Sequence, residues 1–201
     1  MGAPGVDPVD IRPARPGDGE AIARVHVDSW RAAYRDLLPV AVLDGLSAAQ
    51  RTRHWDRVLL PASMDRVVVA ERDGEVVGFG HVGPARDAEV VGFGHVGPAR
   101  DADVDPTTGQ LATIYLRPEF WGSGVGRRVH EAALAELAGL GYRHVVLWML
   151  STNVRAARFY RRQGWERDGG IRVQQFGGAV VIDHRLARGL PPAQIFWRPS
   201  Q

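Results

Sequence analysis

The sequence contains no cysteine and no lysine, and each absence excludes a class of chemistry. A chain without cysteine has no disulfide framework, no thiolate nucleophile and no zinc–thiolate site. All 25 basic residues are arginines, whose guanidinium groups stay protonated at neutral pH and cannot serve as a general base. Mechanisms that need a side-chain amine, such as Schiff-base formation, are therefore excluded.

Long apolar runs and a strong charge imbalance are also missing. The longest purely apolar run covers 145–150, far below the ~20 residues that cross a bilayer. The start, MGAPGVDPVDIR, shows no secretion signal, so we expect a cytoplasmic protein with no membrane partner. The net charge of +2 makes a nucleic-acid partner unexpected. The histidines show no metal-binding spacing, so no metal is expected.

The sequence does contain a duplication: EVVGFGHVGPARDA occurs at 75–88 and again, unchanged, at 89–102. A solenoid needs about three or more units to bury a continuous core, and no third copy follows. We interpret it as a local tandem duplication of one strand and its loop within an otherwise ordinary domain.

Strand and helix patterns alternate along the chain and predict an α/β or α+β fold. The expected strands are 9–14, 66–71, 75–82, 109–118, 144–150, 171–176 and 179–186. The expected helices run from Asp18 to Pro39, from a capping box at Ser47 and Gln50 onward, from about 125 to a stop at Gly141, and from about 153 to 163. The buried face expected for the third helix is Val125, Val129, Ala133 and Leu137. Asp73-Gly74 predicts a tight hairpin between two strands.

The segment 121–126, WGSGVG, is a candidate phosphate cradle between a strand and a helix. Glycines let the backbone approach a ligand, and the first amides of a helix face outward at the positive end of its dipole. A plain tight turn is the alternative. A dinucleotide-binding fingerprint fails because residue 127 is arginine, and a Walker loop fails because the chain has no lysine.

The span LATIYLRPEFWGSGVGRRVHEAALAELAGLGYRHVVLWMLSTNVRAARFYRRQGW resembles the core of the GNAT acetyltransferases, the acyl-CoA-dependent N-acyltransferase superfamily. The resemblance rests on IYLRPEFWGSGVG, on Asn153 after the next strand, and on NVRAARFYRRQGW. A weaker likeness at the N-terminus extends it to a domain over 9–190, with a flexible stretch at 1–8 and a C-terminal tail at 191–201.

The resemblance implies a mixed, mostly antiparallel sheet flanked by helices, whose fourth and fifth strands splay around acetyl-CoA. It implies that the coenzyme is bound by Ile114, Tyr115, Leu116, Gly122, Ser123, Gly124, Val125, Gly126, Arg127 and Asn153. Tyr160 would lie near the thioester sulfur and protonate the leaving thiolate, and the Leu116 amide would stabilise the oxyanion. The alternatives are purely structural roles: Tyr160 would be a packed aromatic side chain, and Asn153 would be a helix N-cap.

Two positions depart from the family pattern. Many members carry a glutamate base where this sequence has Gln110, which cannot accept a proton, and Trp121 stands where arginine or glutamine is commonest. Other candidates for the base or for acceptor contacts are His81, His95, Asp28 and Tyr34.

The duplicated strand cannot join the sheet twice, because one extra antiparallel strand would reverse the strand that follows. Using the first copy gives a two-residue turn and one long connection, which loop-closure entropy favours by roughly 1 kcal/mol. We predict that the first copy lies in the sheet. The second becomes a loop or pairs with another molecule.

These features predict an acetyl-CoA-dependent N-acetyltransferase that acts on a primary amine of a small molecule or peptide, with a homodimer as a possible state. An alternative is a non-catalytic acyl-CoA-binding or regulatory module on the same fold. A toxin that acetylates charged tRNA would need an arginine-rich acceptor face, and the low net charge argues against it.

Overall fold

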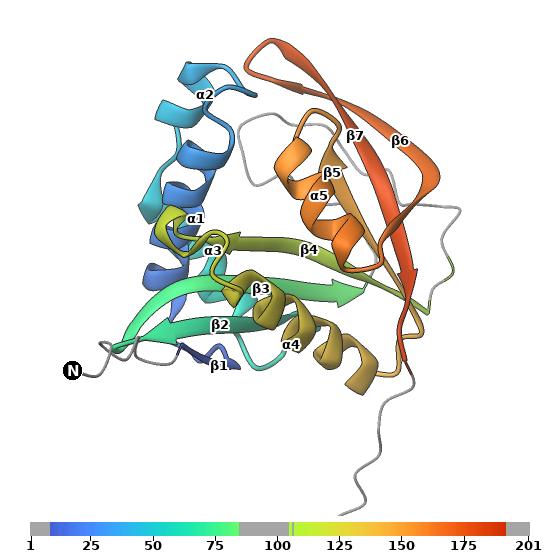
Figure 1. The fold of residues 1–201 in the computed structure, drawn as a ribbon. Helices are drawn as coiled ribbons and strands as arrows, with labels where there is room; N and C mark the ends of the chain where they lie inside the picture. Colours follow the sequence, from blue (N-terminus) through green and yellow to red (C-terminus); the bar gives the residue numbers. More distant parts are fainter. Residues whose placement is uncertain (1–8, 85–104, 106, 192–201) are drawn as a thin grey trace, which may run out of the picture.

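A computed structural model describes residues 9–84, 105 and 107–191, which form a seven-stranded sheet in the order β1-β2-β3-β4-β5-β7-β6 (Figure 1). The strands are β1 (Asp10–Pro13), β2 (Arg66–Arg72), β3 (Glu75–Pro84), β4 (Thr108–Leu116), β5 (His144–Leu150), β6 (Glu166–Phe176) and β7 (Ala179–Gly189). The helices are α1 (Gly19–Ala33), α2 (Val40–Asp44), α3 (Ala48–Val58), the short 3₁₀ turn η1 (Pro118–Phe120), α4 (Val125–Gly139) and α5 (Val154–Arg162). Neighbouring strands are antiparallel except β4 and β5, which are parallel. The expected mixed, mostly antiparallel sheet is confirmed.

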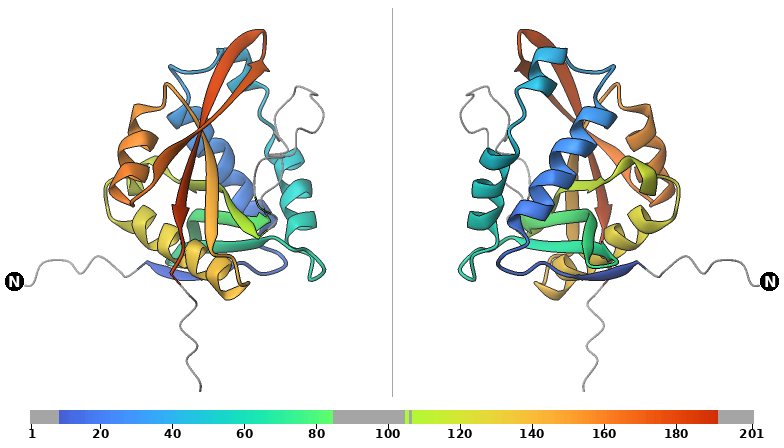
Figure 2. Two further views of the ribbon diagram at one scale, coloured as in Figure 1. Left: turned by 90° about the vertical axis from the view of Figure 1, so that its right-hand side faces the viewer. Right: turned by 90° about the vertical axis from the view of Figure 1, so that its left-hand side faces the viewer.

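Helices cover both faces of the sheet, with α1 and α3 on one side and α4 and α5 on the other (Figure 2). Strand β2 shows how the sequence sets this arrangement. Val67 and Val69 pack with Trp55 of α3, whereas Val68 and Ala70 belong to the cluster under α4. Alternate residues of a strand face opposite sides, so a run of apolar residues serves both layers.

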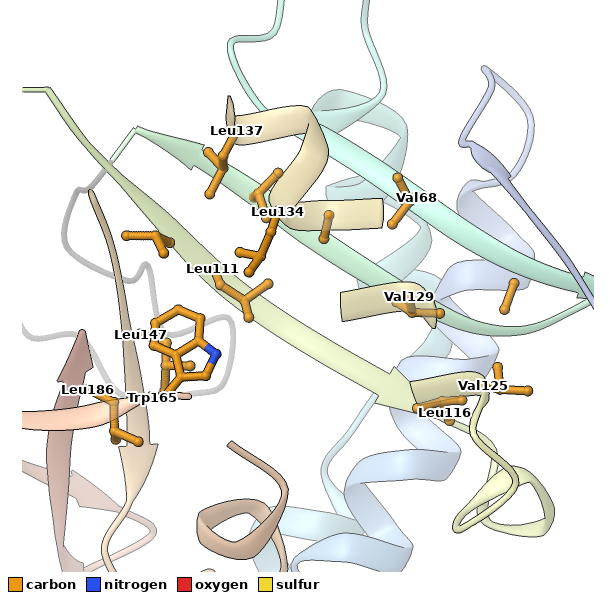
Figure 3. Close-up of a cluster of buried hydrophobic side chains, with 14 of the residues drawn as sticks. Val68, Leu111, Leu116, Val125, Val129, Leu134, Leu137, Leu147, Trp165 and Leu186 are labelled. Carbon is orange, nitrogen blue, oxygen red and sulfur yellow. The ribbon is translucent and has the colours of Figure 1, made fainter. Parts of the chain in front are cut away.

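Helix α4 buries the face that its four-residue spacing predicts (Figure 3). The predicted core residues Val125, Val129, Ala133 and Leu137 are at most 6% exposed. Gly141, with φ 93°, follows the helix end as expected, and its N–H donates to the Ala138 carbonyl.

The hairpin between β2 and β3 confirms that the first copy of the duplication lies in the sheet. Asp73 and Gly74 form its two-residue turn with φ of 52° and 78°, the conformation that Asp-Gly favours. Strand β3 consists of residues from the first copy and pairs with β2 on one edge and β4 on the other. The second copy, 89–102, lies outside the described residues.

The first helix is shorter than its sequence pattern predicts, and α2 was not predicted. The helix ends at Ala33, and the Tyr34 carbonyl then accepts the N–H groups of Leu37 and Leu38 in a turn. The turn lets Leu38 and Leu43 pack against Val181 of β7 in a buried cluster. A straight helix to Pro39 would carry these side chains away from the sheet, so a tertiary contact overrides the local pattern.

Candidate active site

Strands β4 and β5 diverge and open the sheet between them. They pair only at 108–110, opposite 144–146. Beyond that point β4 continues to Leu116 and β5 to Leu150 without pairing to each other. The register of β4 against β3 shifts at Ala112, a bulge that bends the strand. The splay expected from the resemblance is confirmed.

The backbone of β4 beyond the split presents polar groups to the opening. The Arg117 N–H donates to the Val77 carbonyl of β3 at 2.9 Å. Backbone N–H and carbonyl groups of successive residues point to opposite edges of a strand. The Leu116 N–H and carbonyl therefore point away from β3. That carbonyl accepts hydrogen bonds from Ser29 Oγ (2.7 Å) and Trp121 Nε1 (3.0 Å), which together fix the orientation of the peptide.

The amides of the loop before α4 and of the first turn of α4 divide into two sets. The Ser123 N–H donates to the Phe120 carbonyl (3.4 Å) and the Arg127 N–H to the Gly124 carbonyl (3.1 Å). The Val125 N–H lies 3.4 Å from Ser123 Oγ. These three amides already have partners within the segment 120–124, so they are less suitable for holding a ligand.

Three glycines alternate with those residues and line a cavity. Gly122 and Gly124 have φ of 79° and 90°, where a side chain would be strained. A Cβ on Gly126 would come within 3.3 Å of Leu116 Cδ1, tightening the gap between the loop and β4. At the N-terminus of α4 their amides add to the positive end of the helix dipole, so this loop suits an anionic group.

Trp121, the departure from the usual family residue, joins three elements. Its indole N–H donates a hydrogen bond to the Leu116 carbonyl. The Arg155 guanidinium of α5 lies over its ring, 3.3 Å from the centroid. Burial lowers the pKa of Arg155. This stacking was not predictable from the sequence, because Trp121 and Arg155 lie on separate elements.

Asn153 begins α5 as its N-cap. The side chain is 8% exposed, and its Oδ1 accepts the Ala156 N–H at 3.0 Å. Asn153 also lines the cavity. The capping alternative is thus what the structure shows, and it is compatible with a ligand contact from the remaining groups of the amide.

Three tyrosines approach one another in the cavity. Burial raises the pKa of Tyr160, and the neighbouring Tyr34 phenol adds to the rise. Burial, with Tyr34 as the next cause, raises the pKa of Tyr115 well above its ordinary value, and burial likewise raises that of Tyr34. All three hydroxyls therefore keep their protons at neutral pH and can donate them.

A cavity of about 930 Å³ brings most of the expected site residues together. Those lining it are Ile114, Tyr115, Leu116, Gly122, Gly124, Gly126, Arg127, Asn153 and Tyr160. Ser123, in the loop, and Val125, the first residue of α4, do not line the cavity. The side chain of Val125 is buried in the core under α4.

The candidates for a base or an acceptor contact separate in the structure. Gln110 and Tyr34 line the cavity, and Gln110 is 4% exposed. Asp28 is exposed on α1, and His81 faces Asp65 at 3.5 Å; neither lines the cavity. His95 lies outside the described residues.

Another part of the lining was not singled out by sequence reasoning. It consists of Trp30 and Leu38 from the α1 region and of Trp148, Arg172, Gln174, Phe176, Val181 and Asp183 from β5, β6 and β7. Cross-strand pairing assembles the second group: Asp183 lies opposite both Leu150 and Arg172. Only the strand order, which the sequence patterns leave open, reveals this grouping.

The described part of the chain shows neither a metal-binding cluster nor a membrane-spanning helix. Residues 9–84, 105 and 107–191 contain no group of three or more histidine, aspartate or glutamate side chains placed to hold a metal ion. None of the helices in these ranges has the length and apolarity to cross a membrane.

Comparison with known proteins identifies the family. A model of the acetyltransferase (GNAT) family matches residues 27–165. An uncharacterized N-acetyltransferase, YuaI, of Bacillus subtilis is 29% identical over 84% of this chain and 91% of its own length. An uncharacterized N-acetyltransferase of Archaeoglobus fulgidus is 30% identical over 79% of this chain and 94% of its own. The solved structure of yncA, a putative acetyltransferase from Salmonella typhimurium with acetyl-CoA, has a similar fold, with a TM-score of 0.65 at 19% identity over 92% of this chain and 95% of that one. The chain therefore belongs to the GNAT family of acetyltransferases.

Proposed function

We propose that the protein is an acetyl-CoA-dependent N-acetyltransferase that acts on a primary amine. The observation that carries the proposal is the split between β4 and β5, which opens beside the glycine loop of α4. It offers an unpaired strand edge for an extended ligand and helix N-terminal amides for an anionic one within the same cavity.

The chemistry of the lining fits acetyl-CoA. The edge groups of Ile114 and Leu116 suit the amide-containing pantetheine arm, and the amides of Gly122, Gly124 and Gly126 suit a pyrophosphate. Four arginines on α4 and α5 also line the cavity: Arg127, Arg155, Arg158 and Arg162. Guanidinium groups bind phosphate oxygens in bidentate fashion, so this cluster supports a polyanionic ligand.

When bound, acetyl-CoA supplies the acetyl group as a thioester. The Leu116 N–H is the donor for the negative charge that develops on the carbonyl oxygen, because its peptide is already oriented by Ser29 and Trp121. Tyr160 donates its proton to the departing thiolate. Gln110, which has no charge, contributes no base, so the amine loses its proton to another group or to water.

The test is a thiol-release assay with acetyl-CoA and a panel of primary amines. We expect free coenzyme A thiol to accumulate only when an acceptor amine is present, with the acetylated amine detected by mass spectrometry. Binding of acetyl-CoA without turnover of any amine would contradict the proposal and would instead support the non-catalytic module.

Homodimer formation and a cytoplasmic location remain predictions. Strand β6 is an edge of the sheet, and the hairpin that it forms with β7 exposes four β-branched side chains, Ile171, Val173, Val180 and Ile182. Their alternation puts them on one face of the hairpin, opposite the cavity-lining residues Arg172 and Asp183. Light scattering on the purified chain determines whether two copies associate.

A further inference from the structure

Asp183 stands out electrostatically within the cavity. Of the residues that the structure describes, it alone brings a carboxylate to the lining, whereas five arginines line the same cavity. The acceptor of the proposed reaction arrives at neutral pH as an ammonium ion, because unperturbed amines have pKa values near ~10. A buried anion in a cationic cavity is where such a group is stabilised most.

The Asp183 carboxylate is oriented by two neighbours on β6. Arg172 Nη2 donates to Oδ2 at 2.9 Å, and Gln174 Nε2 donates to the same oxygen. Asp183 is 7% exposed. Both of these bonds fall on Oδ2, so we assign Oδ1 as the oxygen that contacts a ligand. Arg172 is in turn positioned by the Trp148 ring, whose centroid is 4.6 Å from the guanidinium carbon.

This ion pair lies beside the proposed reaction centre. Asp183 pairs with Leu150, the last residue of β5, three positions before Asn153. The Asp183 charge contributes to the raised pKa of Tyr34, and Tyr34 in turn contributes to that of Tyr160. Asp183, Tyr34 and Tyr160 are thus electrostatic neighbours, and all three line the cavity.

We infer that Asp183 and Arg172 bind the acceptor as a zwitterion, with the ammonium group on Asp183 and a carboxylate on Arg172. This inference rests on the proposed function and names its substrate class: an α-amino acid, whose ammonium and carboxylate groups flank a single carbon and can reach an anion and a cation that lie as close together as Asp183 and Arg172 (2.9 Å). The surrounding Trp30, Leu38 and Val181 are apolar and favour an uncharged side chain. A polyamine would place its second cation among the arginines and is disfavoured.

The first experiment compares amino acids with their decarboxylated counterparts in the acetyl-transfer assay: L-leucine with isoamylamine, and L-phenylalanine with phenethylamine. Spermidine is the polycationic probe. Each charge-assisted hydrogen bond contributes roughly 10- to 100-fold. We therefore expect kcat/KM to be at least ~10-fold higher for the amino acid of each pair, and lowest for spermidine. Equal or higher values for the amines lacking the carboxylate would overturn the inference.

The second experiment removes each charge. Asp183→Asn should lower kcat/KM for L-leucine by roughly 10- to 100-fold, mainly through KM. Arg172→Gln should abolish the preference for leucine over isoamylamine. The control is Asp168→Asn, because Asp168 forms a comparable ion pair with Arg185 on the same two strands (2.7 Å) without lining this cavity. It should leave the preference unchanged.

Calorimetric titration with acetyl-CoA separates this inference from the proposed function. All three variants should bind acetyl-CoA with the wild-type Kd, which also shows that they are folded. Unchanged acetyl-CoA binding and turnover of other amines, with no acetylation of any α-amino acid, would refute the zwitterion site alone. Failure of the wild-type chain to bind acetyl-CoA would refute both.

Discussion

Tyr160 carries the hydroxyl assigned to protonate the leaving thiolate, and its substitution is the most direct test at the scale of a residue. General-acid catalysis contributes typically ~10²–10⁴-fold, so Tyr160→Phe should lower kcat by about 100-fold or more. The Kd for acetyl-CoA should stay close to that of the wild type. Because the pKa of Tyr160 is raised above its ordinary value of 10.0, we expect no loss of activity from deprotonation of its hydroxyl up to about pH 10.

The matched control is Tyr142→Phe. Tyr142 packs at the edge of the core beneath α4 and does not line the cavity. Equal kcat values for the two phenylalanine variants would show that Tyr160 is only a packed aromatic.

His130 of α4 predicts a pH dependence of stability. Its Nε2 accepts the Trp165 indole N–H at 2.8 Å, and the side chain is 1% exposed. Burial, together with Arg188, lowers its pKa to about 4 from 6.5. Between these two values the unfolded chain binds a proton that the folded chain does not, so stability falls as the pH falls through this window. His130 alone should lower the free energy of unfolding by roughly 2 kcal/mol from pH 7 to pH 5.

Urea unfolding at the two pH values measures this effect in the wild type and in His130→Gln, which keeps an acceptor for Trp165. The His130→Gln variant should lose the part of the pH dependence of unfolding that His130 contributes. His144→Gln, at an exposed position, should retain it. If the free energy of unfolding changed equally between the two pH values in all three chains, the assignment to His130 would be contradicted.

At this scale the sequence predicts residues whose role follows from local geometry. Gly124, with its positive φ, and Asn153, at the start of α5, are recognisable because turn and cap chemistry restrict the residue type. Asp183 and Arg172 are not recognisable, since nothing local distinguishes a cavity-facing ion pair from one on the surface.

At the scale of elements, the duplication offers an internal control for the assignment of β3. Phe79 is fully buried, with its ring 4.9 Å from Trp55, and Phe93 holds the same place in the second copy. Phe79→Ala should lower the free energy of unfolding by about 3–5 kcal/mol because it leaves a core cavity. Phe93→Ala should change it by less than about 1 kcal/mol, since β3 uses the first copy. Denaturant unfolding of the two variants measures both, and equal losses would show that the copies exchange places.

Most elements were predictable because their ends carry specific residues, such as the Asp73-Gly74 turn and the glycine after α4. The end of α1 and the short α2 were not predictable, because the backbone there is determined by the packing of Leu38 and Leu43 against Val181. Those contacts join residues more than 130 positions apart, beyond the reach of any local pattern.

For the whole molecule, the second copy is expected to be dispensable. Deleting residues 89–102 gives the same chain as deleting 75–88, because the copies are identical. The shorter connection between β3 and β4 should raise the free energy of unfolding by roughly 0.8 kcal/mol through loop closure. The Kd for acetyl-CoA should be unchanged. An insoluble or inactive deletion variant would show that the second copy contributes to the fold.

The family motif predicted the side of the cavity to which we assign the coenzyme, because strand, loop and helix are contiguous there. The side that we propose for the acceptor is lined by residues of α1, β5, β6 and β7, so it could be recognised only from the strand order β5-β7-β6. The reaction class can thus be predicted from the sequence, whereas the residues proposed to bind the acceptor can be recognised only from the tertiary structure.

The central claim is that the opening between β4 and β5, with the glycine loop beside it, binds acetyl-CoA. Calorimetric titration of the wild-type chain with acetyl-CoA tests it most directly. The account predicts saturable binding of one acetyl-CoA per chain, weakened when Gly124→Val places a side chain at φ 90° in the loop. Absence of binding, or binding that Gly124→Val leaves unchanged, would contradict it.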